Sequence, residues 1–124
     1  MNFFIGLGVL LSLSPMAKAG NPREVIACQN EHYQLILRET AVPTYKEGTL
    51  NFSGRSIHMK CQGEFQPNSK NVSFTCEEDR AGDGRYLAGV VLMGAEGNAE
   101  IVHEQMYPLQ PKSLAKIPCK LDQE

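Results

Sequence analysis

The chain has 124 residues, with 12 Lys and Arg against 14 Asp and Glu and a formal net charge of −2. This balance disfavours nucleic acid and anionic lipid as partners, because both select clustered Lys and Arg. The length suits one ordinary domain with one modest core. We therefore expect a monomeric single domain with no nucleic-acid partner.

Residues 1–19 have the pattern of a signal peptide. The apolar run from Met1 to Leu13 is too short to span a bilayer, which takes about 20 residues. Ser14-Pro15 breaks it, and Ala17-Lys18-Ala19 places small residues at the alternate positions that a signal peptidase selects. We expect cleavage after Ala19, a single disulfide-bonded β domain over residues 20–124 with no membrane span, and a periplasmic or secreted location.

Four cysteines, an even number in an exported chain of this size, predict two disulfide bonds. A zinc site is disfavoured, because zinc ligands come in close pairs and no two of these cysteines are closely spaced. Two pairings are attractive: Cys28 with Cys61 and Cys76 with Cys119, or Cys28 with Cys119 around Cys61 with Cys76. The nested pairing closes the longer loop and removes more unfolded-state entropy, about 4 to 5 kcal/mol against roughly 3 for a short loop.

Alternation of apolar and polar residues dominates the first half of the mature chain and predicts strands with one buried face. In chain order, the residues expected to face inward are Tyr33, Leu35 and Leu37, then Leu50 and Phe52, then Ile57, Met59 and Cys61, then Val72, Phe74 and Cys76. Ser53-Gly54 predicts a turn, since Gly adopts a positive φ without steric cost, so residues 49–61 are expected to form a hairpin. Residues 62–71 have no period and are expected to be a loop.

In the second half, the apolar run from Leu87 to Met93 predicts a strand covered on both faces, and Gly89 within it indicates a bulge or a close approach. A turn is expected over 94–98 and a return strand over 99–104. Residues 114–119 are expected to be the last strand, which Pro118 would confine to an edge or a strand end. Seven or eight short strands predict an all-β fold, a small antiparallel barrel or a two-sheet sandwich.

No residue pattern indicates catalysis or a bound metal. The cysteines are expected to be in disulfides, and the sequence contains no G-x-S-x-G, H-E-x-x-H or P-loop spacing. The acidic loop places Asp79 and Asp83 as in an EF-hand, but Ala81 and Val90 stand where two further ligands are required. We expect a non-enzymatic protein without a metal or cofactor.

The segment Gly84-Arg85-Tyr86, together with the residues after it as far as Ile101, resembles the C-type lysozyme inhibitors of the periplasm or outer membrane of Gram-negative bacteria. The similar positions are Gly89, Val91, Gly94, Gly97, Ala99 and Ile101 after this segment, and Cys28, Tyr33, Leu35, residues 50–57 and Cys119 elsewhere. The resemblance implies an eight-stranded antiparallel barrel, a bridge between the first and last cysteines, and a loop that inserts into the cleft of a lysozyme.

The chain departs from that family in the inhibitory loop. The family reads S-G-x-x-Y where residues 82–86 read Gly-Asp-Gly-Arg-Tyr, so only Tyr86 carries over; the tryptophan that usually comes after this loop is absent. We expect Asp83, Arg85 and Tyr86 to bind a basic lysozyme-type glycosidase, because an Arg and a Tyr on a rigid turn can pair with its carboxylates. The alternatives are a half-buried strand aromatic for Tyr86 and an envelope-associated structural protein without a defined target.

Overall fold

The computed structural model describes residues 23–66, 71–80, 82 and 84–122, so the expected signal peptide and Asp83 lie outside the described residues. The described part contains eight strands. They are β1 (Glu24–Gln29), β2 (Tyr33–Glu39), β3 (Tyr45–Phe52), β4 (Arg55–Gln66), β5 (Asn71–Glu78), β6 (Gly84–Met93), β7 (Glu96–Met106) and β8 (Leu109–Leu121).

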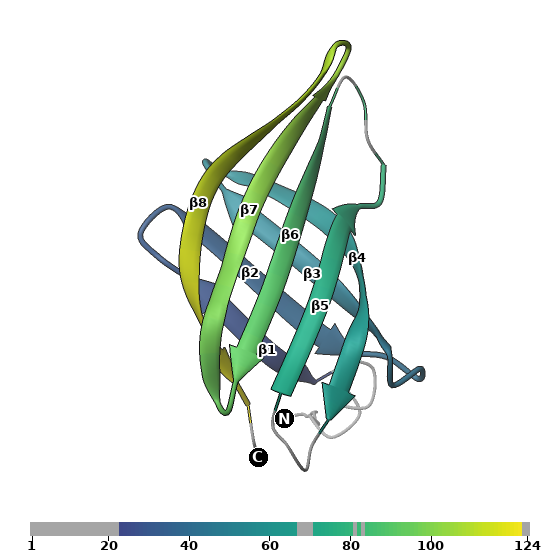
Figure 1. Cartoon of the computed structure of the whole chain (residues 1–124), viewed down its shortest axis with the longest axis vertical. Helices are drawn as coiled ribbons and strands as arrows, with labels where there is room; N and C mark the ends of the chain where they lie inside the picture. Colours follow the sequence, from purple (N-terminus) through teal and green to yellow (C-terminus); the bar gives the residue numbers. More distant parts are fainter. Residues whose placement is uncertain (1–22, 67–70, 81, 83, 123–124) are drawn as a thin grey trace, which may run out of the picture.

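The strands pair in chain order, each antiparallel to the next, and β8 pairs with β1 to close a barrel (Figure 1). The expected all-β antiparallel domain is therefore confirmed, as a barrel and not a sandwich. Because successive strands run in opposite directions, the connections β1–β2, β3–β4, β5–β6 and β7–β8 lie at one end. We call this the upper end. The β7–β8 hairpin extends beyond the rest of the barrel there (Figure 1).

The core fills the barrel interior with the inward side chains of every strand, and the predicted alternation is confirmed in the segments for which it was expected. The largest fully buried side chains include Leu35, Leu37, Leu50, Met59, Val72, Phe74, Val90, Leu92, Ile101 and Ile117. Burying a side chain of this kind contributes about 1.5 to 3 kcal/mol relative to leaving it exposed. Because the buried apolar side chains of the described strands face this interior, strand register is fixed by which residues face it.

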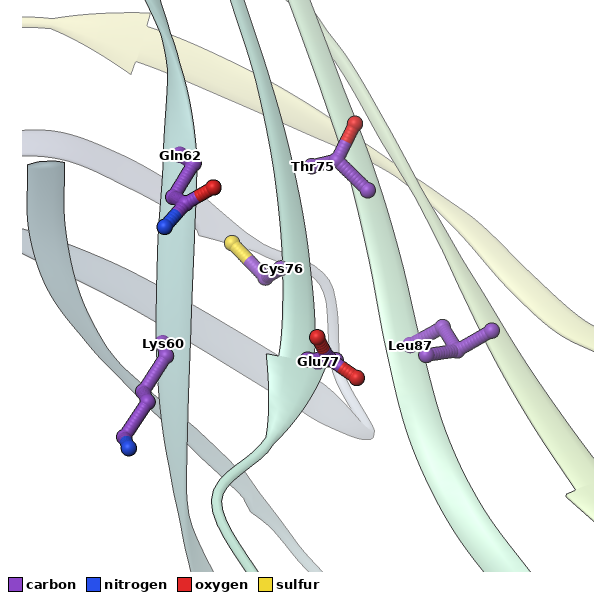
Figure 2. Close-up of a pocket in the computed structure, with 6 residues that line it drawn as sticks. All are labelled: Lys60, Gln62, Thr75, Cys76, Glu77 and Leu87. Atoms are coloured by element: carbon purple, nitrogen blue, oxygen red, sulfur yellow. The ribbon is translucent and has the colours of Figure 1, made fainter. Parts of the chain in front are cut away.

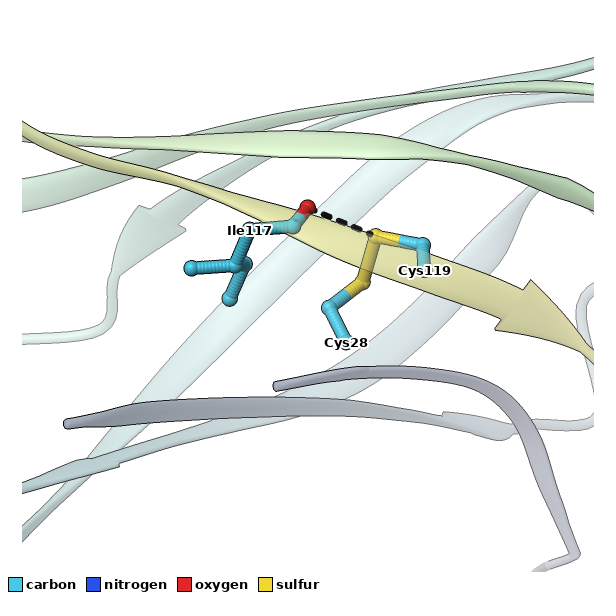
Figure 3. The surroundings of a disulfide bond; sticks show 3 residues. All are labelled: Cys28, Ile117 and Cys119. Atoms are coloured by element: carbon cyan, nitrogen blue, oxygen red, sulfur yellow. Dashed lines mark hydrogen bonds between the residues drawn. A yellow bond between two sulfur atoms is a disulfide. The ribbon is translucent and has the colours of Figure 1, made fainter. Parts of the chain in front are cut away.

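Two disulfides join neighbouring strands in the nested pairing. Cys28 is bonded to Cys119 across the β1–β8 seam, and Cys61 to Cys76 between β4 and β5. Each bond joins residues that are direct register partners. The Sγ of Cys119 also lies 3.8 Å from the carbonyl oxygen of Ile117, a contact that is marked by the dashed line in Figure 3. The bridge between the first and last cysteines closes the barrel where the ladder is shortest.

The predicted hairpin over residues 49–61 is confirmed. Ser53 and Gly54 form its turn with φ of 50° and 73°. Positive φ at both central residues is the geometry of a type I′ turn, whose twist matches that of the flanking strands. This turn places Arg55 at the upper end, at the first residue of β4.

Three sequence expectations about the bounds of strands and turns were wrong. Residues 62–66 continue β4 instead of forming a loop. Gly63 allows β4 and β5 to lie close together here, since a Cβ at this position would collide with the backbone of Ser73 and Phe74. The strand β1 was missed, since a register shift between Glu24 and Ile26 breaks its alternation. The turn after β6 is also shorter than expected, and β7 begins at Glu96.

The strand β6 is not covered on both faces. Val91 is 54% exposed and Met93 is 77% exposed, because a single-layered barrel has no second layer over its outer wall. Gly89 lies in an unbroken register, and a Cβ there would meet nothing within 4 Å, so the expected bulge or close approach is wrong. Pro118 lies inside β8 and directly precedes Cys119, the first residue of that strand that pairs with β1. A local edge of the sheet thus accommodates it.

Candidate functional site

Four aromatic rings line the inside of the barrel at its upper end. Tyr33 begins β2, Phe52 ends β3, Tyr86 lies near the start of β6, and His103 lies near the end of β7. Each continues the inward alternation of its strand. Tyr33 and Phe52 are register partners, as are Tyr86 and His103. The fold thereby gathers four residues from distant parts of the sequence.

These rings form one chain of contacts. Ring centroids are 5.2 Å apart for Tyr33 and Phe52, 5.2 Å for Phe52 and Tyr86, and 4.5 Å for Tyr86 and His103. Tilted pairs at this spacing contribute about 0.5 to 1.5 kcal/mol each beyond area burial. We call these four residues the aromatic rim. All four are half-buried, so they close the core and remain partly accessible from outside.

Gly84 makes room for one ring of the rim. A Cβ at this position would lie 2.6 Å from the carbonyl oxygen of Glu104 and 2.8 Å from Nε2 of His103. The absence of a side chain therefore allows the His103 imidazole to lie against the start of β6 and to contact Tyr86.

Arg55 lies over the aromatic rim from the β3–β4 turn. Its Nη1 donates a hydrogen bond to the hydroxyl of Tyr86 at 3.2 Å. Its guanidinium carbon is 5.4 Å from the ring centre of Phe52 and 5.5 Å from that of Tyr86. Both distances are within the range of cation–π attraction. Although Arg55 is exposed, its guanidinium is held by contacts from two other strands.

Arg85 points the opposite way from Tyr86. Successive residues of a strand face opposite sides, so Arg85 lies on the outer wall while Tyr86 faces the interior. Its Nε donates to Glu104 at 3.0 Å and its Nη1 to Glu77 at 3.4 Å. The side chain of Glu104 is only 17% exposed. Of the three expected binding residues, the structure thus separates Arg85 from Tyr86, and Asp83 lies outside the described residues.

A groove of about 540 Å³ opens beside Arg55, lined by residues 55–58 and 78–80. The Asp79 carboxylate in this groove lies 3.0 Å from Nζ of Lys60 and 3.2 Å from Nδ1 of His58. The Lys60 hydrogen bond lowers the pKa of Asp79, and the same bond raises the pKa of Lys60. Glu78 accepts the backbone N–H of Tyr86 at 3.2 Å. The acidic groups of the groove therefore already have partners.

A second hollow, of about 290 Å³, lies on the outer wall over β4, β5 and β6 (Figure 2). Its charged residues are Lys60, which pairs with Asp79, and Glu77, which pairs with Arg85. These charges are therefore matched within the fold, and the other polar side chains of the hollow are the neutral Gln62 and Thr75. Within the described ranges, no three His, Cys, Asp or Glu side chains are grouped so as to hold a metal ion.

The tip of the β7–β8 hairpin adds exposed apolar surface to the upper end. Tyr107 is 84% exposed and Leu109 is 63% exposed. Tyr is one of the residue types enriched among the hot spots of protein interfaces. The upper end therefore carries the aromatic rim, the Arg55 cation and an apolar tip together.

The sequence prediction included Tyr86, and the structure brings this residue together with Arg55, Phe52 and His103, which the prediction did not include. The alternation did place Phe52 on the inner face. Its proximity to Tyr86, however, depends on barrel closure, which no local signal encodes.

Comparisons with protein-family models, curated proteins and solved structures find no significant match to this chain. The part of the chain that the structure describes contains no helix with the length and apolar character that crossing a membrane requires.

Proposed function

We propose that this protein is an exported, non-enzymatic binding protein that contacts a macromolecular partner through the upper end of its barrel, and that the partner is a basic lysozyme-type glycosidase. The observation that carries the proposal is the gathering of the aromatic rim, Arg55 and the Tyr107 tip at one end. Tyr and Arg are the residue types that most often dominate binding energy at protein interfaces.

The chemistry of the chain supports an exported binder. Two disulfides are consistent with an oxidising compartment outside the cytoplasm. Among the described residues no cysteine is free to act as a nucleophile. A net charge of −2 favours encounter with a basic partner, since opposite charge raises association rates. The barrel also gives the upper end a rigid support, which reduces the ordering cost of binding.

The test is inhibition of a basic c-type lysozyme in a cell-wall lysis assay, with the exported protein purified in its oxidised form. We expect stoichiometric inhibition that weakens as salt is raised. No inhibition at micromolar protein would reject the lysozyme-type partner and favour the envelope-associated structural role.

A matched pair of surface variants locates the contact. Tyr107→Ser removes an exposed apolar side chain at the upper end, and Met93→Ser removes one of similar exposure at the opposite end. The first is expected to weaken inhibition by about tenfold or more, as loss of a hot-spot aromatic does. The second should leave inhibition unchanged. Equal effects of the two variants would contradict the location of the site.

A further inference from the structure

Arg55 is distinguished from the other arginines by its electrostatic surroundings. Arg23, Arg38 and Arg85 each lie within 4.0 Å of a carboxylate oxygen. Among the described residues, Arg55 has no carboxylate within that distance, and its hydrogen bond goes to the neutral hydroxyl of Tyr86. The positive charge of Arg55 is thus available to a ligand, whereas that of Arg85 is compensated inside the fold.

The hydrogen-bonding edge of Arg55 is also available. A guanidinium binds a carboxylate most specifically through two parallel N–H groups, and one such pair is Nε with Nη2. Tyr86 uses Nη1, and neither Nε nor Nη2 donates to another described residue. The rings of Phe52 and Tyr86 meanwhile limit the motion of the guanidinium. Preorganisation of this kind reduces the side-chain entropy lost on binding.

The groove beside Arg55 leaves space for an acidic group. Arg80 lines it as well, and no hydrogen bond or ion pair joins Arg80 to the rest of the described chain. Among the described residues, no carboxylate of the groove lies within ion-pair distance of Arg55: one oxygen of Glu78 accepts the backbone N–H of Tyr86, and Asp79 pairs with Lys60 and His58.

We infer that Arg55, stacked on Phe52 and Tyr86, is the residue that binds a side-chain carboxylate of the protein partner, in the role for which the sequence favoured Arg85. This inference rests on the proposed function, since it names the chemistry by which the upper end recognises its partner. The ligand class is a carboxylate presented on a protein surface or cleft, which Arg55 binds in bidentate fashion and Arg80 attracts.

The first experiment does not require the lysozyme. The protein is labelled with ¹⁵N, and the Nε–H signals of its arginines are followed during titration with N-acetyl-tetraglutamate amide. We expect a saturable shift of the Arg55 signal that exceeds those of Arg85 and Arg23 several-fold. An Arg55 signal that does not move, or that moves no more than that of Arg85, would overturn the inference.

The second experiment uses lysozyme inhibition by Arg55→Gln, Arg55→Lys and Arg85→Gln. We expect Arg55→Gln to weaken inhibition by at least about tenfold, because it removes a charged hydrogen-bonded pair. Arg55→Lys should restore only part of it, since an ammonium lacks the bidentate edge. Arg85→Gln should stay close to wild type.

The two experiments separate the failure of this inference from the failure of the proposed function. If the wild-type protein inhibits and Arg55→Gln inhibits equally well, the role of Arg55 is rejected while the binding function stands. If the wild-type protein does not inhibit, the lysozyme-type partner is rejected, and the peptide titration alone decides whether Arg55 binds carboxylates. Melting temperatures of all variants show whether any loss reflects unfolding.

Discussion

Removing each disulfide separately tests how the barrel is stabilised. The sequence separation is 91 for Cys28–Cys119 and 15 for Cys61–Cys76. In the chain-entropy model, loops of these lengths contribute about 4.6 and about 3.0 kcal/mol to the free energy of unfolding at 25 °C. The double variant Cys28→Ala/Cys119→Ala is therefore expected to lose about 1.6 kcal/mol more stability than Cys61→Ala/Cys76→Ala.

The comparison is well matched, because all four cysteines are buried and each variant removes two sulfur atoms from the core. The two disulfides also differ in the number of register pairs beside them, and this difference again predicts the larger loss of stability for Cys28→Ala/Cys119→Ala. Only three register pairs hold β1 to β8, against eight between β4 and β5. The bond at the seam therefore closes the weakest ladder as well as the longest loop.

Equilibrium unfolding in guanidinium chloride, followed by far-ultraviolet circular dichroism, measures both variants against the oxidised wild type. We expect the lowest midpoint for Cys28→Ala/Cys119→Ala. An equal loss in the two variants, or a larger loss for the short loop, would refute the reasoning from loop length.

Three further predictions concern single side chains. Gly97→Ala should lower the free energy of unfolding by about 1 to 3 kcal/mol, because the added Cβ would collide with the backbone of β6. Gly89→Ala is the control: its added Cβ would meet nothing within 4 Å, so a urea titration of both variants should show no loss of stability for it. Gly84→Ala should displace the His103 ring and lower the melting temperature, and an unchanged nuclear Overhauser contact between His103 and Tyr86 would contradict this. Burial lowers the pKa of Lys46 below 10.5, so the folded state loses the Lys46 proton at a lower pH than the unfolded state does. The free energy of unfolding of wild type relative to Lys46→Met should therefore rise between pH 7 and pH 10, and a constant difference would contradict this prediction.

Much of the fold was predictable because the side-chain period of a strand is 2 and the barrel has one interior. Leu35, Leu37 and Phe74 could therefore be placed inside from alternation alone. The same reasoning failed for β6, whose outer face carries Val91 and Met93, since local hydrophobicity cannot distinguish a covered wall from an exposed one. It also left the disulfide pairing open, which only strand order decides.

The candidate site was predictable in part. Tyr86 was identified, but the choice between Arg85 and Arg55 depends on cross-strand neighbours. Arg85 is neutralised by Glu104 only because the β6–β7 register makes them partners. Arg55 reaches Tyr86 from another strand, 31 residues away in the sequence. Such relations arise from three-dimensional closure, so no sequence motif indicates them.

The most direct test of the binding surface is a cross-saturation NMR experiment on the labelled protein in complex with a basic c-type lysozyme. We predict attenuated signals at the upper end, at Phe52, Tyr86 and Tyr107, and unaffected signals at Met93 on the opposite end. Attenuation centred on Met93 and the outer wall of β6, with the signals of the aromatic rim unchanged, would contradict the account.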